Sequence, residues 1–361
     1  ARWTRFSRIV EAVKTGSYQP TVVLEQTDQG MEKPLALSAI PLEQFSYRER
    51  TRIVTPDSMN AAAEQYYTRL VERQQYETLK TSLLSALSAR LSKLRTKRGH
   101  LLKQQEQIDQ AEAYKRQGDL ITANIYQLSK GMETAQVVDY YSDRQEMIEI
   151  PLDPRLTPSQ NAQRYFKRYN KLKHGKGIIE QRLQATEQRI AYLEELAFFV
   201  EEAEGMRELE RFQAELEEAD LSTRPKRARQ PRPSEESASP FLRFVSSDGF
   251  EIYVGRSSRE NDLLTQRTAL PDDLWFHVHQ APGSHVVVLN RQRNTTVPEQ
   301  TLREAASLAA YYSKLRRSGK VDVIYTPKKY VKKPKGSPPG LVTLSQFQTL
   351  RVVPQAQIGS S

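Results

Sequence analysis

The stretch LSALSARLSKLRTKRGHLLKQQEQI, residues 84 to 108, decides the fold because its apolar residues recur at the heptad spacing of a coiled coil. Arg98 and Gln105 are polar interruptions of this pattern. The apolar a and d positions are Leu84, Leu87, Leu91, Leu94, Leu101 and Ile108. Upstream, TPDSMN at Thr55 to Asn60 supplies helix N-cap residues. The pattern therefore predicts one uninterrupted helix that follows this segment and ends at about residue 112.

A second heptad stretch occurs later in the chain, with positions spaced alternately four and three residues apart. Its members are Ile179, Leu183, Thr186, Ile190, Leu193, Ala197 and Val200. Two such arms in one chain most simply pair as a long antiparallel coiled-coil hairpin. We therefore assign residues 57–221 to the two arms and the segment between them. At 1.5 Å per residue, about 45 residues in each arm make a rod of roughly 65 Å.

Residues 113–177 separate the arms and are too many for a hairpin turn. GDLITANIYQLSKG, from Gly118, predicts a short helix ended by Gly131. VVDYYSDRQEMIEIPLD, from Val137, predicts a β-hairpin that turns at residues 142–144. PSQNAQRYFKRYNKLKHGKG, from Pro158, predicts a helix with proline in its first turn. We therefore expect a small α/β domain at the tip of the hairpin.

Charge is divided unevenly between this tip and the returning arm. Residues 95–177 hold 15 basic and 10 acidic side chains, whereas residues 178–221 hold 4 and 13. Basic residues recur at helical spacing in the last tip helix, among Tyr165, Phe166 and Tyr169. They are Arg164, Lys167, Arg168, Lys171 and Lys173. This pattern fits a helix laid on RNA phosphates, and it fits equally a solvated basic face whose aromatic residues fill the tip core.

The segments on either side of the hairpin differ in character. Residues 1–56 contain strand-like runs, TVVLEQ from Thr21 and PLALSAIPL from Pro34, and we expect them to be the end of an α+β domain that begins upstream. Residues 222–240 are rich in Pro, Ser and Arg without periodicity, which predicts a basic linker. Its basic residues are Arg224, Lys226, Arg227, Arg229 and Arg232.

A compact α/β domain is predicted for residues 241–354, followed by a short tail at residues 355–361. Two pairs of strands are expected about turns at residues 247–249 and 281–284. TLREAASLAAYYSKLRRSG predicts a helix with Gly319 past its end, VDVIYT predicts a strand, and PKKYVKKPKGSPPG is a basic loop. The predicted fold class is thus α+β and multidomain, with the coiled-coil hairpin preceding this domain.

The net charge of +10 lies almost entirely in the last two fifths of the chain. From residue 222 onward there are 22 Lys and Arg against 11 Asp and Glu, whereas the preceding residues hold 32 and 33. A basic domain on a near-neutral support is typical of nucleic-acid binding, because each neutralised phosphate releases counterions. The absence of cysteine excludes disulfides and thiolate chemistry and suits a cytoplasmic protein, and no apolar run approaches the roughly 20 residues of a membrane span.

The segment DDLWFHVHQAPGSHVVV, residues 272–288, holds three of the five histidines. His277 and His279 are two apart on a strand and share a face, and a tight turn brings His285 back toward them. Three imidazoles could bind a zinc ion, with Asp273 orienting them from outside the ligand set. However, no further His, Glu or Cys lies at ligand spacing. A Ser284 nucleophile with His285 as its base is weaker, because adjacent side chains on an extended backbone diverge.

A recognition hairpin fits this segment better than either active site. Trp275 offers a face on which a base can stack, and the amides of Gly283 and Ser284 can donate to a phosphate in a tight turn. Imidazoles can stack on bases or hydrogen-bond to them. The interleaved apolar residues are expected to fill the core instead, namely Phe276, Val278 and Val286.

Four segments of the last domain resemble, in order and spacing, the RNA-binding domain of the NFACT family. They are GRSSRENDLLT from Gly255, DLWFHVHQAPGSHVVV from Asp273, EAASLAAYYSK from Glu304 and YVKKPKGSPPGLV from Tyr330. GDLITANIYQL and LDPRLTPSQNAQRYFKRYNKLK resemble the family's coiled-coil and middle region, and TPDSMNAAAEQYY resembles the junction where the first arm leaves the N-terminal domain. The resemblance thus covers nearly the whole chain. This family includes bacterial RqcH, also known as fibronectin-binding protein A-like, and the eukaryotic nuclear export mediator factor. Most of the family's N-terminal domain, with an Asp-Arg pair important for tRNA recruitment, has no counterpart here, so we expect a fragment or a truncated paralogue.

The resemblance implies ribosome-associated quality control. Family members bind a large ribosomal subunit obstructed by peptidyl-tRNA, recruit charged tRNA and drive template-free C-terminal tailing, with alanine in bacteria. Ribosomal RNA performs the peptidyl transfer, so we expect a non-enzymatic, monomeric, cytoplasmic factor without a cofactor or metal. Its partners would be ribosomal RNA, a stalk-base protein and tRNA, with no membrane. The rival hypotheses are an adhesin that binds fibronectin and, more remotely, a metal hydrolase built on the histidine cluster.

The predicted RNA and ribosome contacts form three groups. In the histidine hairpin they are Asp273, Trp275, His277, Gly283, Ser284 and His285. In the basic loop they are Lys328, Lys329, Lys332, Lys333 and Lys335. In the tip helix they are Arg164, Lys167, Arg168 and Lys171. By match to the family motif, Asn261, Asp262, Phe276 and Pro282 are also family positions, whereas His279 is incidental.

Overall fold

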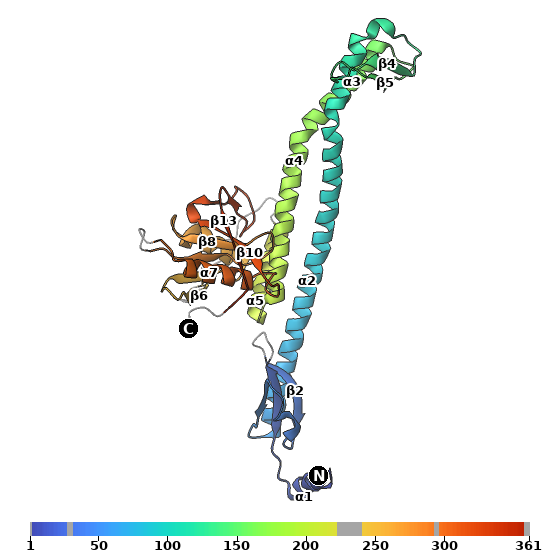
Figure 1. Cartoon of the computed structure of the whole chain (residues 1–361). Helices are drawn as coiled ribbons and strands as arrows, with labels where there is room; N and C mark the ends of the chain where they lie inside the picture. The colour runs from blue at the N-terminus through green and yellow to red at the C-terminus, as the bar shows by residue number, and fades with distance from the viewer. Residues whose placement is uncertain (1, 27–31, 222–239, 292–295, 357–361) are drawn as a thin grey trace. The chain divides into compact units, whose positions relative to one another are not determined.

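A computed structural model describes residues 2–26, 32–221, 240–291 and 296–356 (Figure 1). The chain divides into two compact units: residues 90–191 form one, and residues 1–89 together with 192–361 form the other. We call these the tip unit and the main unit. Residues 222–239 of the predicted basic linker (residues 222–240) and residues 357–361 of the predicted tail lie outside the described residues.

The main unit begins with a helix and a small sheet. Helix α1 spans Arg2–Thr15. Strands β1 (Thr21–Gln26), β2 (Glu32–Ser38) and β3 (Thr51–Val54) form an antiparallel sheet in the order β2-β1-β3. Val22 and Leu24 are buried from solvent and pack with Ala62 of the following helix. The two strands predicted from the sequence are confirmed, whereas the short β3 was not predicted.

The two long helices pair as predicted in an antiparallel hairpin. Helix α2 spans Met59–Asp109, and α4 spans Pro158–Glu202. The hydroxyl of Tyr76 in α2 donates to the carbonyl of Ala203, while Arg98 of α2 lies 3.8 Å from Glu187 of α4. The partner of Arg98, which comes later in α2 than Tyr76, therefore comes earlier in the chain than the partner of Tyr76. This order is that of antiparallel helices. The predicted a and d residues that are buried include Leu87, Leu91, Leu101, Ile108, Ile190, Leu193 and Val200.

Some helix ends differ from the prediction. Helix α3 (Ala111–Ala123) follows α2 directly and ends well before Gly131, because the Asn124 side chain donates to the carbonyl of Leu120, and a short 3-10 turn (Ile125–Gln127) comes next. The tip helix predicted from Pro158 and the second heptad arm are one continuous helix, α4.

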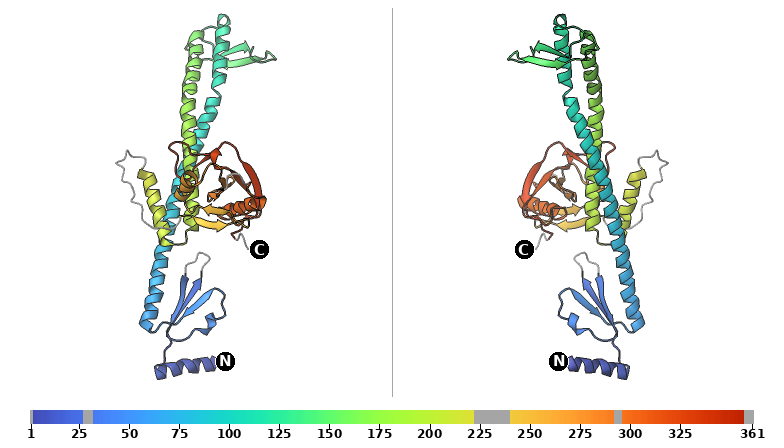
Figure 2. Two further views of the ribbon diagram at one scale, coloured as in Figure 1. Left: turned by 90° about the vertical axis from the view of Figure 1, so that its left-hand side faces the viewer. Right: turned by 90° about the vertical axis from the view of Figure 1, so that its right-hand side faces the viewer.

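The tip unit has its own apolar core. Strands β4 (Thr134–Val138) and β5 (Met147–Pro151) form the predicted antiparallel hairpin, with Ala135 opposite Ile150. Figure 2 shows this hairpin projecting to one side of the helices of the same unit. Its inward residues pack on α3 and on the first turns of α4. The buried members are Leu120, Ile121, Ala135, Val137, Ile150, Leu152 and Ala162.

The C-terminal part of the main unit follows helix α5 (Met206–Leu221) and is built on a six-stranded antiparallel sheet in the order β13-β10-β8-β9-β7-β6. The strands are β6 (Leu242–Val245), β7 (Glu251–Val254), β8 (Leu274–Val278), β9 (Val286–Val288), β10 (Val321–Pro327) and β13 (Gln348–Val352). A smaller ladder pairs β11 (Val331–Lys332) with β12 (Thr343–Leu344) after a 3-10 turn.

Each face of this sheet has a core, because alternate side chains of a strand point to opposite faces. Helix α7 (Glu299–Tyr311) packs on one face with Phe276 and Val278. Helix α6 (Ser258–Leu263) and the following π-helical turn (Leu264–Thr268) lie toward the other face, where Trp275 and Leu264 are buried. The strand pairs are confirmed and β13 was missed. Helix α7 ends well before Gly319 because Tyr312 leaves the helical conformation.

The tip core generates a stability prediction. Ile150 is fully buried, so Ile150→Ala should cost about 2–5 kcal/mol of local stability through reduced burial and the cavity left behind. Hydrogen exchange followed by mass spectrometry should show β4 amides exchanging about 100-fold faster. Glu149→Ala, on the exposed face of the same strand, is the matched control and should leave exchange within a few-fold. Equal exchange in the two variants would contradict the assigned core.

Candidate nucleic-acid interface

The turn between β8 and β9 is held against the end of helix α7. Gly283 forms an antiparallel bridge with Ser313, and the amide of Ser284 donates to the carbonyl of Tyr312 at 2.8 Å. A Cβ at Gly283 would lie 2.8 Å from the Cβ of Ser313, so this close approach requires glycine. The Pro-Gly turn identified from the sequence therefore packs against the end of α7 within the domain.

The aromatic rings of the hairpin cover one another. The ring of Trp275 stacks on that of His277 with centroids 5.7 Å apart, and the ring of His285 meets Trp275 edge-on at 4.9 Å. Trp275 is only 2% exposed, so in this arrangement it offers no open face to a base. The predicted RNA contact of Trp275 therefore stays a prediction, and it would require this segment to open.

Of the two neighbouring histidines, His285 is buried and His277 is half-buried. Burial lowers the pKa of His277 to about 4, despite a hydrogen bond with the Gly283 backbone that raises it. Burial, with the nearby His277, also holds the pKa of His285 well below its usual value. The Nδ1 atom of His285 lies 2.7 Å from the hydroxyl of Thr265, which is its hydrogen-bond partner. Both imidazoles are neutral at physiological pH.

Asp273 acts on the backbone around it. Its carboxylate is fully buried and accepts hydrogen bonds from the amides of Leu270 at 2.7 Å and Asn290 at 2.8 Å. The guanidinium of Arg291 lies 3.9 Å away. The side chain thus joins the segment before β8 to the segment after β9, and its proposed contact with RNA stays a prediction.

Asn261 connects the turn to the coiled-coil arm. Its Oδ1 accepts from the amide of His285 at 2.9 Å, and its Nδ2 donates to the carbonyl of Gly283 at 3.3 Å. The same Nδ2 donates to Oε1 of Glu195, on helix α4, at 2.6 Å. A Cβ at Gly255 would lie 2.4 Å from Oδ1 of Asn261, so glycine is required there as well. Sequence reasoning found Asn261 only as a family position, because its partner lies 66 residues away.

Glu195 is a half-buried acid at this contact. Burial raises its pKa to about 8, the negative charges of Glu215 and Asp262 act in the same direction, and the hydrogen bond from Asn261 opposes them. Gly340, from the basic loop, sits directly over the carboxyl group, since a Cβ there would lie 3.1 Å from Oε1. The acidic arm therefore meets the C-terminal domain through a carboxyl group that is largely protonated at neutral pH.

Ion pairs surround this contact between the acidic helices and the basic domain. Arg316 lies 3.1 Å from Glu202 of α4, and Arg259 pairs with Glu218 of α5. Three further pairs, Arg259 with Glu215, Arg256 with Glu208 and Arg211 with Glu260, are 3.8–3.9 Å long. Several of the domain's arginines are thus already paired with carboxylates of the same chain. Ser284 lines a cleft of about 340 Å³ at this contact, together with Phe199 and Tyr312.

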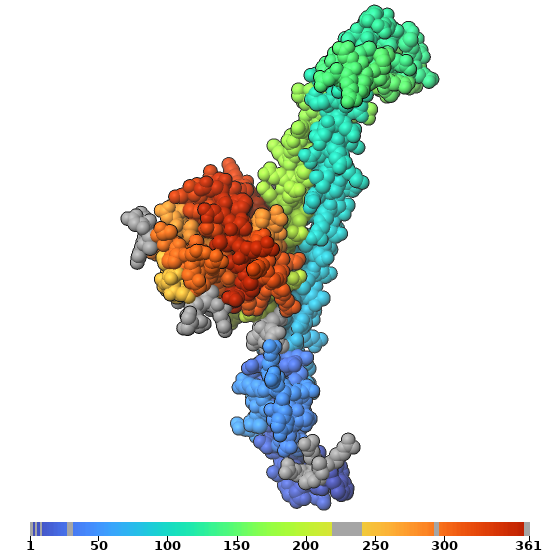
Figure 3. Space-filling model, viewed as in Figure 1, coloured from blue at the N-terminus to red at the C-terminus, as the bar shows by residue number. Residues whose placement is uncertain are grey.

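The lysines of the predicted basic loop belong to the last part of the C-terminal domain, which is coloured orange-red to red in Figure 3. Lys329, Lys332 and Lys335 are exposed, whereas Lys328 and Lys333 are half-buried. Lys333 lies 2.7 Å from Asp262, and Lys329 lies 3.4 Å from Asp272. The loop keeps positive charge in solvent even after these pairs are counted.

The four predicted contacts of the tip helix are also exposed. Arg164, Lys167, Arg168 and Lys171 face solvent on α4. Tyr165 and Phe166, between them, pack against the tip core. The basic side chains are therefore available to an anion, while these two aromatic side chains serve at least in part as core. Among the described residues, no group of three or more His, Asp or Glu side chains is placed to hold a metal ion.

The chain matches two family models. Residues 1–235 match the NFACT N-terminal and middle domains, and residues 240–345 match the NFACT protein RNA binding domain. The protein named Rqc2 homolog RqcH of Bacillus subtilis is 35% identical over 304 residues, which cover 83% of this chain and 52% of that protein. The human ribosome quality control complex subunit NEMF is 32% identical over 73 residues, 20% of this chain and 7% of its own length.

A solved structure shares the fold. It is the C-terminal part of the fibronectin/fibrinogen-binding protein of Streptococcus suis, with a TM-score of 0.54 and 29% identity, covering 78% of this chain and 96% of that one. The present chain spans about half the length of the bacterial relatives that it matches. Within the described residues, no helix is both long and apolar enough to cross a membrane.

The raised pKa of Glu195 predicts a pH effect on stability. Between the ordinary glutamate pKa of 4.5 and about 8, the folded chain holds a proton that the unfolded chain has released. This contribution to the free energy of unfolding is present below pH 4.5 and is lost as the pH rises through 8. Glu195→Gln should remove this loss, because glutamine does not ionise. In urea unfolding, the free energy of unfolding of the variant should therefore rise relative to that of the wild type between pH 5 and pH 8, by on the order of 2 kcal/mol.

The exposed Glu201, on the same helix, supplies the control, because Glu201→Gln should leave the wild-type pH dependence unchanged. If Glu195→Gln and the wild type respond identically to pH, Glu195 is ionised in the folded chain and the assigned burial is incorrect.

The depressed pKa values of the hairpin histidines predict acid sensitivity. An unfolded His277 takes up a proton below about pH 6.5, whereas the folded one does so only near pH 4. Stability contributed by the neutral ring is therefore present above pH 6.5 and falls as the pH drops toward 4. Nuclear magnetic resonance titration, with assignment by His277→Asn, should show no midpoint for this imidazole above pH 5. A midpoint near 6.5 would show that the surroundings of His277 do not depress its pKa.

Proposed function

Because this chain belongs to the NFACT family, we propose that it is a ribosome-associated quality-control factor that binds large ribosomal subunits obstructed by peptidyl-tRNA. The names of its relatives, Rqc2 homolog RqcH and ribosome quality control complex subunit NEMF, support this assignment. The role includes supporting tRNA recruitment and the template-free addition of an alanine tail to the stalled chain.

The observation that carries the proposal is the match of the basic C-terminal domain to the family's RNA-binding model. That domain keeps Lys329, Lys332 and Lys335 in solvent. Exposed lysines attract a polyanion, because each phosphate contact releases condensed counterions. The exposed arginines and lysines at the start of α4 provide a second basic surface on the tip unit.

The mechanism follows from binding and positioning. In the proposed role the chain holds the obstructed subunit and its tRNA in place, and ribosomal RNA performs the peptidyl transfer. The tip unit contacts the stalk base, meaning its RNA and the associated protein, through the basic start of α4. The factor acts as a monomer in the cytoplasm and needs no cofactor.

The second candidate function is an adhesin that binds fibronectin. It is favoured by one observation, the likeness to a solved structure described as part of a fibronectin/fibrinogen-binding protein. Binding of the purified chain to immobilised fibronectin, measured beside binding to large subunits at the same salt concentration, separates the two candidates. Fibronectin binding without subunit binding would reject the proposed function.

The lysine-rich segment generates a direct test by co-sedimentation with obstructed large subunits over a salt series. The test variant replaces Lys328, Lys329, Lys332, Lys333 and Lys335 with Ala. For every phosphate that a lysine no longer neutralises, the slope of log affinity against log salt should fall by about 0.9 if ribosomal RNA responds as B-form DNA does. We therefore expect weaker binding and a flatter slope. The result checks whether these lysines contact phosphates.

A control with the same change in charge excludes a general electrostatic effect. It replaces exposed basic residues elsewhere in the same domain, namely Arg303, Lys314, Arg317, Lys320 and Arg351. We expect this variant to keep the greater part of the salt slope. An unchanged slope in the lysine variant would show that these lysines make no phosphate contacts, and absence of wild-type binding at low salt would reject the ribosome role itself.

A further inference from the structure

The tip unit contains a hollow that the sequence did not reveal. It has a volume of about 660 Å³ and lies where the end of β5 meets α3 and the first turns of α4. Its volume falls within the roughly 300–1,000 Å³ of small-ligand pockets. We call it the tip hollow, and the lining residues used below are Tyr114, Asp153, Arg155, Arg164, Tyr165 and Arg168.

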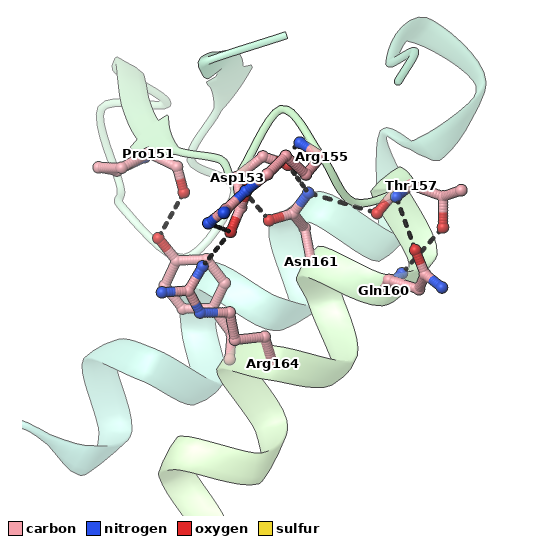
Figure 4. A network of polar contacts seen from close by, with 8 residues as sticks. Pro151, Asp153, Arg155, Thr157, Gln160, Asn161 and Arg164 are labelled. Atoms are coloured by element: carbon pink, nitrogen blue, oxygen red, sulfur yellow. Dashed lines mark hydrogen bonds and ion pairs between the residues drawn. The ribbon is translucent and has the colours of Figure 1, made fainter. Parts of the chain in front are cut away.

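The rim of the tip hollow is preorganised by the loop before α4 (Figure 4). The amide of Asp153 donates to Oδ1 of Asn161 at 2.8 Å, and Nδ2 of Asn161 donates back to the Asp153 carbonyl at 3.1 Å. Thr157 and Gln160 bond reciprocally through backbone amides and side chains, which is a capping box at the start of the helix. The loop is thus fixed at both of its ends.

The charge of the tip hollow favours an anion. Three of its lining residues are arginines and one is an aspartate. The carboxylate of Asp153 accepts from Arg155 at 3.1 and 3.2 Å and from Arg164 at 3.2 Å, so a single acid holds two guanidinium groups at the rim (Figure 4). The side chains of both arginines remain more than half exposed. A phosphate can therefore reach both guanidinium groups without displacing buried side chains.

One wall of the tip hollow is made of planar groups. The rings of Tyr114 and Tyr165 have centroids 6.2 Å apart, and the guanidinium of Arg168 lies 4.5 Å over the ring of Tyr114. The hydroxyl of Tyr165 donates to the carbonyl of Pro151 at 2.7 Å, which fixes that ring. Aromatic rings and guanidinium planes are the surfaces on which proteins stack unpaired bases.

We propose that the tip hollow binds one unpaired nucleotide of an RNA. The base stacks against Tyr114 and Arg168, while Arg155 and Arg164 hold the adjoining phosphates. This inference deepens the proposed function and rests on it for the source of the RNA. An acidic peptide would satisfy the arginines, but it would leave the planar wall without a planar partner. A continuous duplex would offer phosphates without a base to stack.

The test uses the full chain and fluorescence anisotropy with two labelled RNA hairpins that differ by one bulged adenosine. The wild type should bind the bulged hairpin about tenfold more tightly, which corresponds to stacking of one base. Tyr114→Leu and Arg168→Ala should each reduce this preference to about twofold or less. Arg164→Ala should weaken binding of both hairpins and reduce the salt slope by about 1.

Arg144→Ala is the matched control, because it removes one exposed arginine of the same unit that does not line the tip hollow. It should keep the tenfold preference. Hydrogen exchange of β4 and β5 should be unchanged in every variant, which shows that the tip core is intact. A loss of preference together with faster exchange would count as unfolding, and Tyr114→Phe, which keeps the ring, must then retain the preference.

Equal binding of the two hairpins by the wild type, or a preference that survives Tyr114→Leu, would overturn the proposal. Arg168-dependent binding of a Glu-rich peptide, with no binding of either hairpin, would overturn it in favour of a protein partner. Co-sedimentation with large subunits separates the two levels of inference. Intact co-sedimentation without a bulge preference rejects the tip hollow alone, whereas a bulge preference without co-sedimentation rejects the ribosome role.

Discussion

The contact on which the C-terminal domain depends is the set of hydrogen bonds made by one amide side chain, that of Asn261. It accepts from the amide of His285, donates to the carbonyl of Gly283 and donates to Glu195 on the coiled-coil arm. An amide suits this place because it supplies an acceptor and two donors without a charge. Replacing it with an apolar residue would leave several buried polar groups unpaired, each at a cost of about 1–3 kcal/mol.

This arrangement explains why the most recognisable segment of the chain lies inside the domain. The glycines at 255 and 283 leave room for close approach of backbone and amide, and the rings of Trp275, His277 and His285 fill the space beside them. A motif of this kind identifies the family because it specifies packing. The surface that meets a polyanion is supplied by other residues, whose requirement is exposure and charge rather than shape.

The parts of the fold that could be predicted from sequence are those written in local patterns. Heptads gave the paired helices, and alternating residues gave the strands. The predicted helix ends were wrong where a side chain competed with the helix for a backbone hydrogen bond. The amide side chain of Asn124 does so by donating to the carbonyl of Leu120. The merging of the tip helix with the second arm, the strand β13 and the contact of Asn261 with Glu195 depend on tertiary context, which no local window contains. The tip hollow was invisible for the same reason, since it joins α3 to the loop before α4.

Pairing within the chain also changes what the net charge of +10 means. Helices α4 and α5 bring carboxylates to Arg256, Arg259 and Arg316, so these arginines already have partners when an RNA arrives. An RNA that recruited them would have to break ion pairs, some of them partly buried, and would gain little. The net electrostatic attraction must therefore come mainly from more exposed basic side chains, in the lysine-rich segment and on the tip unit, where Arg155 and Arg164 share the single carboxylate of Asp153. By pairing with several arginines, the acidic arm thus restricts the positive charge that is open to RNA to defined surfaces. This restriction favours a particular orientation of the bound RNA.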